Sequence, residues 1–174
     1  MKLMRGILPA VLLTALVSCA SDSAPVTAGG ATLLRHDVAP EDIDVNGTDI
    51  GELVLFNGCV ASGGDPETTS PEEFAYSAIY LVWPAGYDLR ENGSALEVLD
   101  PDGDVVVGIG DRVGVKGRWH DLAEAQEHAE IPEPCRESDA RLGGLTDVYI
   151  LVRGVLPEYT ERTPSRSAED APAP

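Results

Sequence analysis

Basic side chains are scarce in this sequence. Its 174 residues include 12 lysines and arginines against 30 aspartates and glutamates, which gives a formal net charge of −18. A chain of this charge is repelled by nucleic acid and by an anionic membrane surface. We therefore expect no nucleic-acid partner. The acidity indicates either a need for solubility in the surrounding medium or a surface that meets a basic partner.

Long apolar runs are missing after position 17. The chain opens with Met-Lys-Leu-Met-Arg, and residues 6–17 form an apolar segment too short to span a bilayer comfortably. This segment ends in Leu-Val-Ser-Cys at positions 16–19, which resembles the lipobox of bacterial lipoproteins. In that family the chain is cleaved before the cysteine, whose thiol then carries diacylglycerol with fatty acids such as palmitate. The resemblance implies a signal peptide over residues 1–18, lipidation of Cys19 and a protein anchored outside the cytoplasm to a bacterial membrane. An ordinary secretory signal is the alternative.

Cysteine is rare too, with three residues in the chain. If Cys19 carries lipid, Cys59 and Cys135 remain, and an exported compartment is oxidising. We expect these two to form one disulfide, because redox-active thiol pairs are typically close in sequence.

Composition divides the chain after the signal peptide into three parts. Residues 19–49 are rich in Ser, Ala, Gly, Pro and Asp, which predicts a flexible tether whose apolar patch at 32–34 docks on the domain. Residues 50–157 form a single domain, and residues 158–174 are expected to be a disordered tail. Cleavage after residue 18 removes Lys2 and Arg5 and no acid, which leaves a mature charge of −20.

The domain is predicted to be mainly β. Apolar segments at 52–60, 76–83 and 146–155 predict strands, and 99–119 predicts a hairpin followed by a strictly alternating strand. After it, Asp121 and Glu124 fit a capping box that starts a short helix ended by Pro132 and Pro134. We predict a small antiparallel OB-like barrel of five to six strands with one short helix, and a β-sandwich is the alternative.

Three short motifs support the barrel. They are Gly-x-Leu-x-x-x-x-Gly-Cys at 51–59, Val-Trp-Pro-x-Gly at 82–86 and Gly-Asp-x-Val-x-x-x-Gly at 110–117. Together they resemble uncharacterised exported bacterial domains with an OB-like barrel. The resemblance covers about residues 50–155 and implies a fold and a later cysteine that pairs with the one after Gly58. It implies no activity.

The candidate ligand-binding residues are basic and aromatic. Arg112, Lys116 and Arg118 alternate along one predicted strand, in a domain with seven basic and twenty acidic side chains. Cross-strand pairing with acids explains such cations, and a stripe that binds an anionic group is the functional interpretation. Trp83 and Tyr87 would flank such a site, or serve as core and loop anchors.

Catalytic and metal motifs are weak. His120, Glu124 and His128 are four residues apart, but eight residues of straight helix rise about 12 Å, which separates the histidines too far to share an ion. Asp100, Asp102 and Asp104 are explained by a hairpin turn, since the positions that a calcium loop needs are occupied by other residues.

We therefore expect no catalytic residues, metal or cofactor. The predicted function is a non-catalytic, lipid-anchored envelope protein that binds a protein, peptide or glycan partner or serves as a structural module. A cell-surface enzyme or metal protein is the alternative, and carboxylates and histidines that converge in a cleft would favour it.

Overall fold

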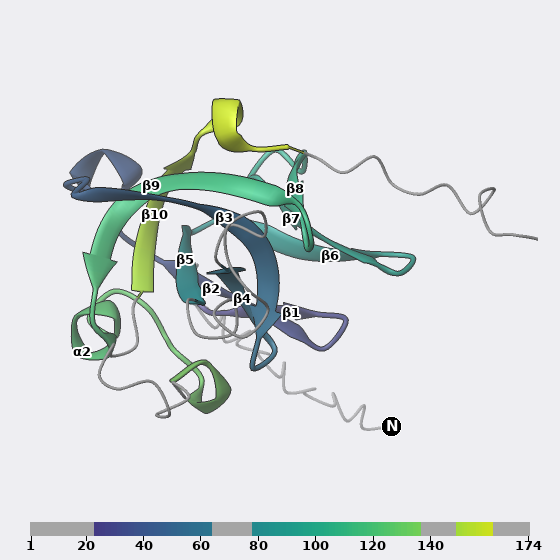
Figure 1. Ribbon diagram of the computed structural model, residues 1–174. Helices are drawn as coiled ribbons and strands as arrows, with labels where there is room; N and C mark the ends of the chain where they lie inside the picture. The colour runs from purple at the N-terminus through teal and green to yellow at the C-terminus, as the bar shows by residue number, and fades with distance from the viewer. Residues whose placement is uncertain (1–22, 64–77, 137–148, 162–174) are drawn as a thin grey trace, which may run out of the picture.

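Six strands close into a barrel in the computed structural model, which describes residues 23–63, 78–136 and 149–161 (Figure 1). Around the barrel the order is β2, β4, β3, β9, β10 and β5, and β5 pairs again with β2. β1 extends the sheet beside β2, and β6, β7 and β8 form a second sheet. In chain order the elements are β1 (Val26–Ala28), β2 (Ala31–His36), η1 (Pro40–Asp42), β3 (Gly47–Phe56), β4 (Cys59–Gly63), β5 (Ile79–Pro84), β6 (Asp88–Asn92), β7 (Ala95–Leu99), β8 (Val105–Gly108), β9 (Arg112–His120), α2 (Leu122–Ala125), η2 (Glu133–Arg136), β10 (Tyr149–Val155) and η3 (Pro157–Tyr159).

This architecture confirms the predicted small β-barrel with one short α-helix in the described part of the chain, and closure of the sheet excludes the sandwich. The pairing is mixed rather than wholly antiparallel. β5 runs parallel to both β2 and β10, while β3 pairs antiparallel with β4 and β9. In Figure 1 the long, curved β3 and β9 form one wall, with the second sheet on one side of the barrel and α2 on the other.

The prediction of a flexible tether over residues 19–49 is wrong for most of that range. β2 is a barrel strand in which Ala31, Leu33 and Leu34 are fully buried, and β3 begins at Gly47. The tail also begins later than expected, because η3 packs on β9 and Glu161 pairs with the backbone of Arg112. The signal peptide with Cys19, and residues 162–174 of the tail, lie outside the described residues.

The strand predicted over 52–60 is in fact a hairpin. β3 ends at Phe56, Asn57 and Gly58 turn the chain with φ of 50° and 76°, and β4 returns beside β3. Asn-Gly is a favoured pair for such turns because both central residues need positive φ. The 99–119 prediction is confirmed, with β7 and β8 paired across Asp100–Asp104 and β9 following Gly110.

Apolar side chains from all six strands fill the barrel interior, and a second apolar cluster lies outside β2, β4, β5 and β10, beneath α2 and η2. Neighbours along these strands belong to different clusters, as Leu33 and Leu34 do. Burial on both faces explains why these strands carry few polar residues. The buried interior side chains are Ala31, Leu33, Leu53, Val60, Leu81, Trp83, Val113, Val115, Ile150 and Val152.

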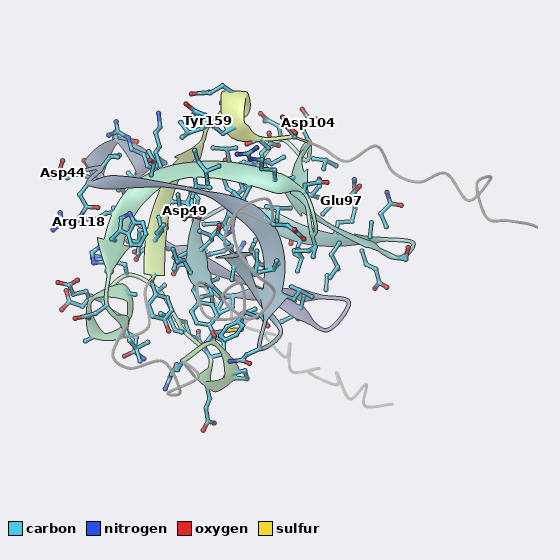
Figure 2. All side chains as sticks on the ribbon, in the orientation of Figure 1. Asp44, Asp49, Glu97, Asp104, Arg118 and Tyr159 are labelled. Carbon is cyan, nitrogen blue, oxygen red and sulfur yellow. A yellow bond between two sulfur atoms is a disulfide. The ribbon has the colours of Figure 1, made fainter. Side chains whose placement is uncertain are left out.

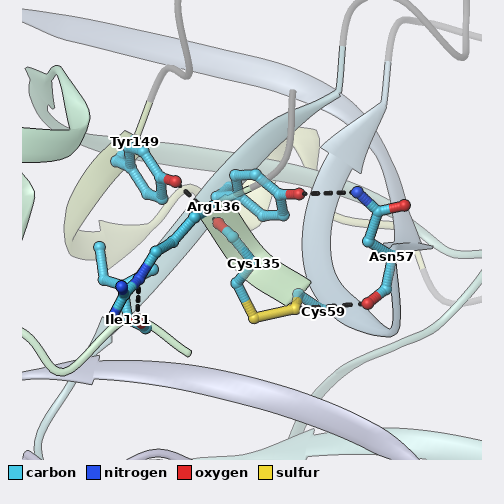
Figure 3. The surroundings of a disulfide bond; sticks show 7 residues. Asn57, Cys59, Ile131, Cys135, Arg136 and Tyr149 are labelled. Carbon is cyan, nitrogen blue, oxygen red and sulfur yellow. Dashed lines mark hydrogen bonds between the residues drawn. A yellow bond between two sulfur atoms is a disulfide. The ribbon is translucent and has the colours of Figure 1, made fainter. Parts of the chain in front are cut away.

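The predicted disulfide is present between Cys59, at the start of β4, and Cys135 in η2, with their Cα atoms 5.8 Å apart (Figure 3). Both residues lie in the outer cluster. Beside the bridge the Tyr149 hydroxyl donates a 2.7 Å hydrogen bond to the carbonyl of Cys135, and the Arg136 guanidinium donates one of 2.6 Å to the carbonyl of Ile131. The bridge therefore joins the segment after α2 to the outside of the barrel.

The predicted capping box is confirmed at the start of α2. The Asp121 carboxylate accepts from the backbone N–H of Glu124 at 2.9 Å, and the Glu124 carboxylate accepts from the N–H of Asp121 at 3.4 Å. The α-helix itself ends at Ala125, after four residues, so the expectation that it continues until Pro132 and Pro134 is wrong. Within the described residues no helix is long and apolar enough to cross a membrane.

Candidate functional site

The three basic residues of β9 differ in how exposed they are. Val113 and Val115 point into the barrel as predicted, and Lys116 and Arg118 are exposed. Arg112 is only half-exposed, and its Nε atom is buried. On a straight strand the Cα atoms of Arg112 and Arg118 would lie about 20 Å apart, so the strand alone does not gather the three cations around one small anion.

Trp83 does not flank a surface site. Its side chain is fully buried in the barrel interior, where its ring packs against that of Tyr87 at a centroid distance of 5.3 Å. Tyr87 is partly exposed, and its backbone carbonyl accepts from the guanidinium of Arg35 at 3.2 Å. The interpretation as core and loop anchors is the one that these contacts support.

The three aspartates lie in the turn between β7 and β8, and the side chain of Asp100 stabilises it. One carboxylate oxygen of Asp100 accepts hydrogen bonds from the backbone N–H groups of Asp102 and Asp104, at 3.0 and 2.9 Å. Such a contact is typical of aspartate in a turn. The hairpin turn predicted at these residues is therefore present.

A pocket of about 330 Å³ lies against the outside of the barrel, where the end of β9, α2 and the segment after η1 meet. We call it the side pocket. Figure 2 shows two of its residues, Arg118 and Asp44, at this side of the molecule. Within the part of the chain that the structure describes, its lining contains four carboxylates, one guanidinium, two imidazoles and no hydroxyl or thiol side chain. The lining residues are Val38, Asp42, Ile43, Asp44, Arg118, His120, Glu124, Glu127, His128 and Leu151.

The two pocket histidines lie much closer together than the sequence spacing predicts. Their ring centroids are 5.7 Å apart and the rings meet edge to face at 60°. The expected separation of about 12 Å is wrong because it assumes a straight helix. His120 instead ends β9, α2 stops at Ala125, and a turn brings His128 back over the pocket.

Glu124 connects the helix cap to the pocket. Its Oε2 atom lies 3.3 Å from Nδ1 of His120, and the exposed fractions of the two side chains are 60% and 8%. The carboxylate therefore reaches the pocket from solvent, while the imidazole is held in the wall. Among the residues that the structure describes, no three or more His, Cys, Asp or Glu side chains are already arranged around one metal position.

The third histidine of the chain lies behind this pair. His36 is fully buried, its Nε2 atom is 3.0 Å from the carbonyl oxygen of Val152, and its backbone pairs with Ala129, next to His128. Burial lowers the pKa of His36 more than its backbone contacts with Val152 and Val38 raise it. All three histidines of the chain therefore gather in one region.

Asp49 is a partly buried acid that the sequence analysis missed. On β3 it alternates with Gly51 and Leu53 toward the barrel interior, its Oδ2 atom is buried without a hydrogen-bond partner, and Figure 2 places it among the barrel strands. Burial raises its pKa, and a hydrogen bond with the Ser62 side chain opposes that rise. The alternation Gly-x-Asp-x-Gly-x-Leu at 47–53 is the signal that places this carboxyl inside.

No family model matches this chain, and no curated protein or solved structure is significantly similar to it.

Proposed function

We propose that this protein is a non-catalytic, lipid-anchored binding protein of the cell envelope, and that the side pocket is its ligand site. The Leu-Val-Ser-Cys sequence at 16–19 supports the anchor. A buried disulfide supports an oxidising compartment, where such bonds persist.

The side pocket is the observation that carries the proposal. Side chains from distant parts of the chain converge on it, and among the described residues its four carboxylates outnumber the one guanidinium, of Arg118. The excess of negative charge on this described lining favours a small cationic ligand over the anionic group that the sequence analysis considered. Among the residues that the structure describes, the lining includes no Ser, Thr or Cys side chain, which favours binding over nucleophilic catalysis.

A metal-binding function is the second candidate, and the pair of imidazoles favours it. Histidines and carboxylates that meet in one cleft favour a metal protein or an enzyme over a simple binding module.

The anchor is tested by labelling cells with a clickable fatty acid. We expect label on the wild-type protein and none on Cys19→Ala, because the thiol is the attachment point. Equal labelling of the two proteins would end the lipoprotein proposal.

The pocket is tested with a thermal-shift panel of cationic probes: divalent metal ions, alkylamines and short lysine peptides, with the matching anions as controls. A probe that binds the folded state at a hundred times its Kd stabilises it by about 2.7 kcal/mol. We expect at least one cationic class to raise the Tm of the wild-type full chain, and not that of D42N/D44N/E127Q.

The matched control variant is E91Q/D102N/E158Q, which removes three exposed carboxylates outside the pocket. We expect it to respond like the wild type. A panel with no shift, or equal shifts in all three proteins, would contradict the proposed site.

A further inference from the structure

The two pocket imidazoles have the separation that a shared metal ion requires. A first-row metal binds an imidazole nitrogen at about 2.0–2.1 Å, so the ring centroid lies roughly 3.2 Å from the ion. Two rings on one ion at tetrahedral or slightly wider angles then have centroids roughly 5–6 Å apart. The centroids of His120 and His128 are 5.7 Å apart.

The contact with Glu124 determines which ring nitrogen of His120 is available to bind a metal ion. When Nδ1–H donates to the carboxylate of Glu124, 3.3 Å away, the lone pair remains on Nε2. Metal-ligating histidines are commonly oriented by a carboxylate in this way, which also raises the basicity of the ligand nitrogen. Asp121 holds Glu124 in place through the capping box, so the helix start positions the ligand.

The remaining charged side chains of the pocket suit a cation that binds both nitrogen and oxygen ligands. Asp42, Asp44 and Glu127 are exposed and line the same pocket, where Arg118 is the one guanidinium among the described residues. Carboxylates alone favour calcium or magnesium, whereas imidazoles favour zinc, copper, nickel and iron. The two imidazoles therefore select a transition metal.

We propose that the side pocket binds one divalent first-row transition-metal ion, with Nε2 of His120 and a ring nitrogen of His128 as ligands. An exposed carboxylate, foremost Glu127 beside His128, turns inward to complete the site, since the described side chains do not already form a three-ligand cluster. This inference rests on the proposed function and names the class of its ligand.

The test uses the full chain in detergent, freed of metal with a chelator and then titrated with zinc by calorimetry and with cobalt by visible absorption. We expect saturable one-to-one binding of zinc and cobalt bands typical of four-coordinate nitrogen and oxygen ligands. Calcium at equal concentration should not compete.

Three variants assign the ligands. His128→Ala, at a partly exposed position, should weaken zinc binding at least tenfold with its Tm unchanged in the absence of metal. Glu124→Gln retains the capping geometry and should weaken binding about tenfold through loss of the orienting charge. Glu130→Gln, an exposed acid outside the pocket, is the matched control and should bind like the wild type.

Zinc binding that is absent in the wild type, or equally strong in His128→Ala, overturns the metal inference and leaves only edge-to-face packing of the two rings. If amines or lysine peptides still bind the wild type and not the pocket variant, the proposed function stands without the metal. If no cationic probe binds, both fail.

Discussion

Asp49 illustrates at the scale of a single residue what burial does to an acid. Its pKa is raised because the barrel interior disfavours the charged form, and the hydrogen bond with Ser62 compensates in part. An acid whose pKa is raised on folding contributes stability that is fully present below its unfolded value of about 3.8. That contribution is lost as the pH rises through the folded pKa.

Asp49→Asn should therefore stabilise the protein at neutral pH, because the amide has no charge to bury. We expect a Tm a few degrees above that of the wild type at pH 7 to 8, and no difference below pH 3.8. Differential scanning calorimetry across this range measures it, with the exposed Asp102→Asn as control. A lower Tm at neutral pH would show that the carboxylate makes a favourable interaction in the interior.

Single residues of the pocket were harder to predict than those of the strands. The capping box of Asp121 and Glu124 is local, so its three-residue spacing was enough to predict it. The approach of His120 and His128 was missed because it depends on where the helix stops. The backbone of Ala129 pairs with His36 from a distant strand, and no local pattern reports such a contact.

At the scale of an element, β9 shows why the alternation of apolar and polar residues reliably predicts which face of a strand is buried. Val113, Val115 and Gly117 face inward, so a period of two correctly predicted the buried face. Glycine at 117 has a packing reason as well: a Cβ atom there would lie 2.1 Å from the carbonyl oxygen of Leu151. The close approach of the β9 and β10 backbones at this position therefore needs a residue without a side chain.

Gly117→Ala should destabilise the fold by about 1–3 kcal/mol, since backbone of β10 must move to accept the methyl group. Gly154→Ala is the matched control, because its Cβ would meet only the end of the Lys116 side chain, at 3.6 Å. Urea denaturation of the two variants measures the difference. Equal stabilities would show that the contact between β9 and β10 is looser than described.

The hairpin of β3 and β4 shows what alternation does not resolve. The stretch 52–60 is apolar on both faces and was interpreted as one strand, although Asn57-Gly58 is a strong turn signal. The two strands have similar apolar sequences because both belong to the wall of the barrel. In such a case the turn residues, and not the apolar pattern, indicate where a strand ends.

At the scale of the whole molecule, two apolar clusters share the barrel wall, and the disulfide connects the outer one to the chain beyond α2. The barrel was predictable from the spacing of strands and turns. Its first strand was not, because β2 lies in a Ser-, Gly- and Ala-rich stretch. Leu34 is buried in a cluster with residues far along the chain, among them Val82, with which it pairs.

Cys135→Ser should lower the free energy of unfolding by about 4 kcal/mol, because the bridge closes a loop of 76 residues in the unfolded chain. Urea denaturation with and without reductant checks this, and reductant should affect only the wild type.

Alkylation before reduction, followed by peptide mass analysis, should leave Cys59 and Cys135 unmodified in wild-type protein from the envelope. Two alkylated cysteines would rule out the bridge in the cell.

If the side pocket holds a cation on two imidazoles, the ring nitrogens of His120 and His128 will respond when the metal is added. Long-range ¹H–¹⁵N spectra of the ¹⁵N-histidine-labelled full chain, recorded during a zinc titration, report every ring nitrogen separately. We expect Nε2 of His120 and one nitrogen of His128 to shift together and saturate at one equivalent, while buried His36 keeps its signals. Unchanged signals from His120 and His128 at saturating zinc would contradict the proposed metal site.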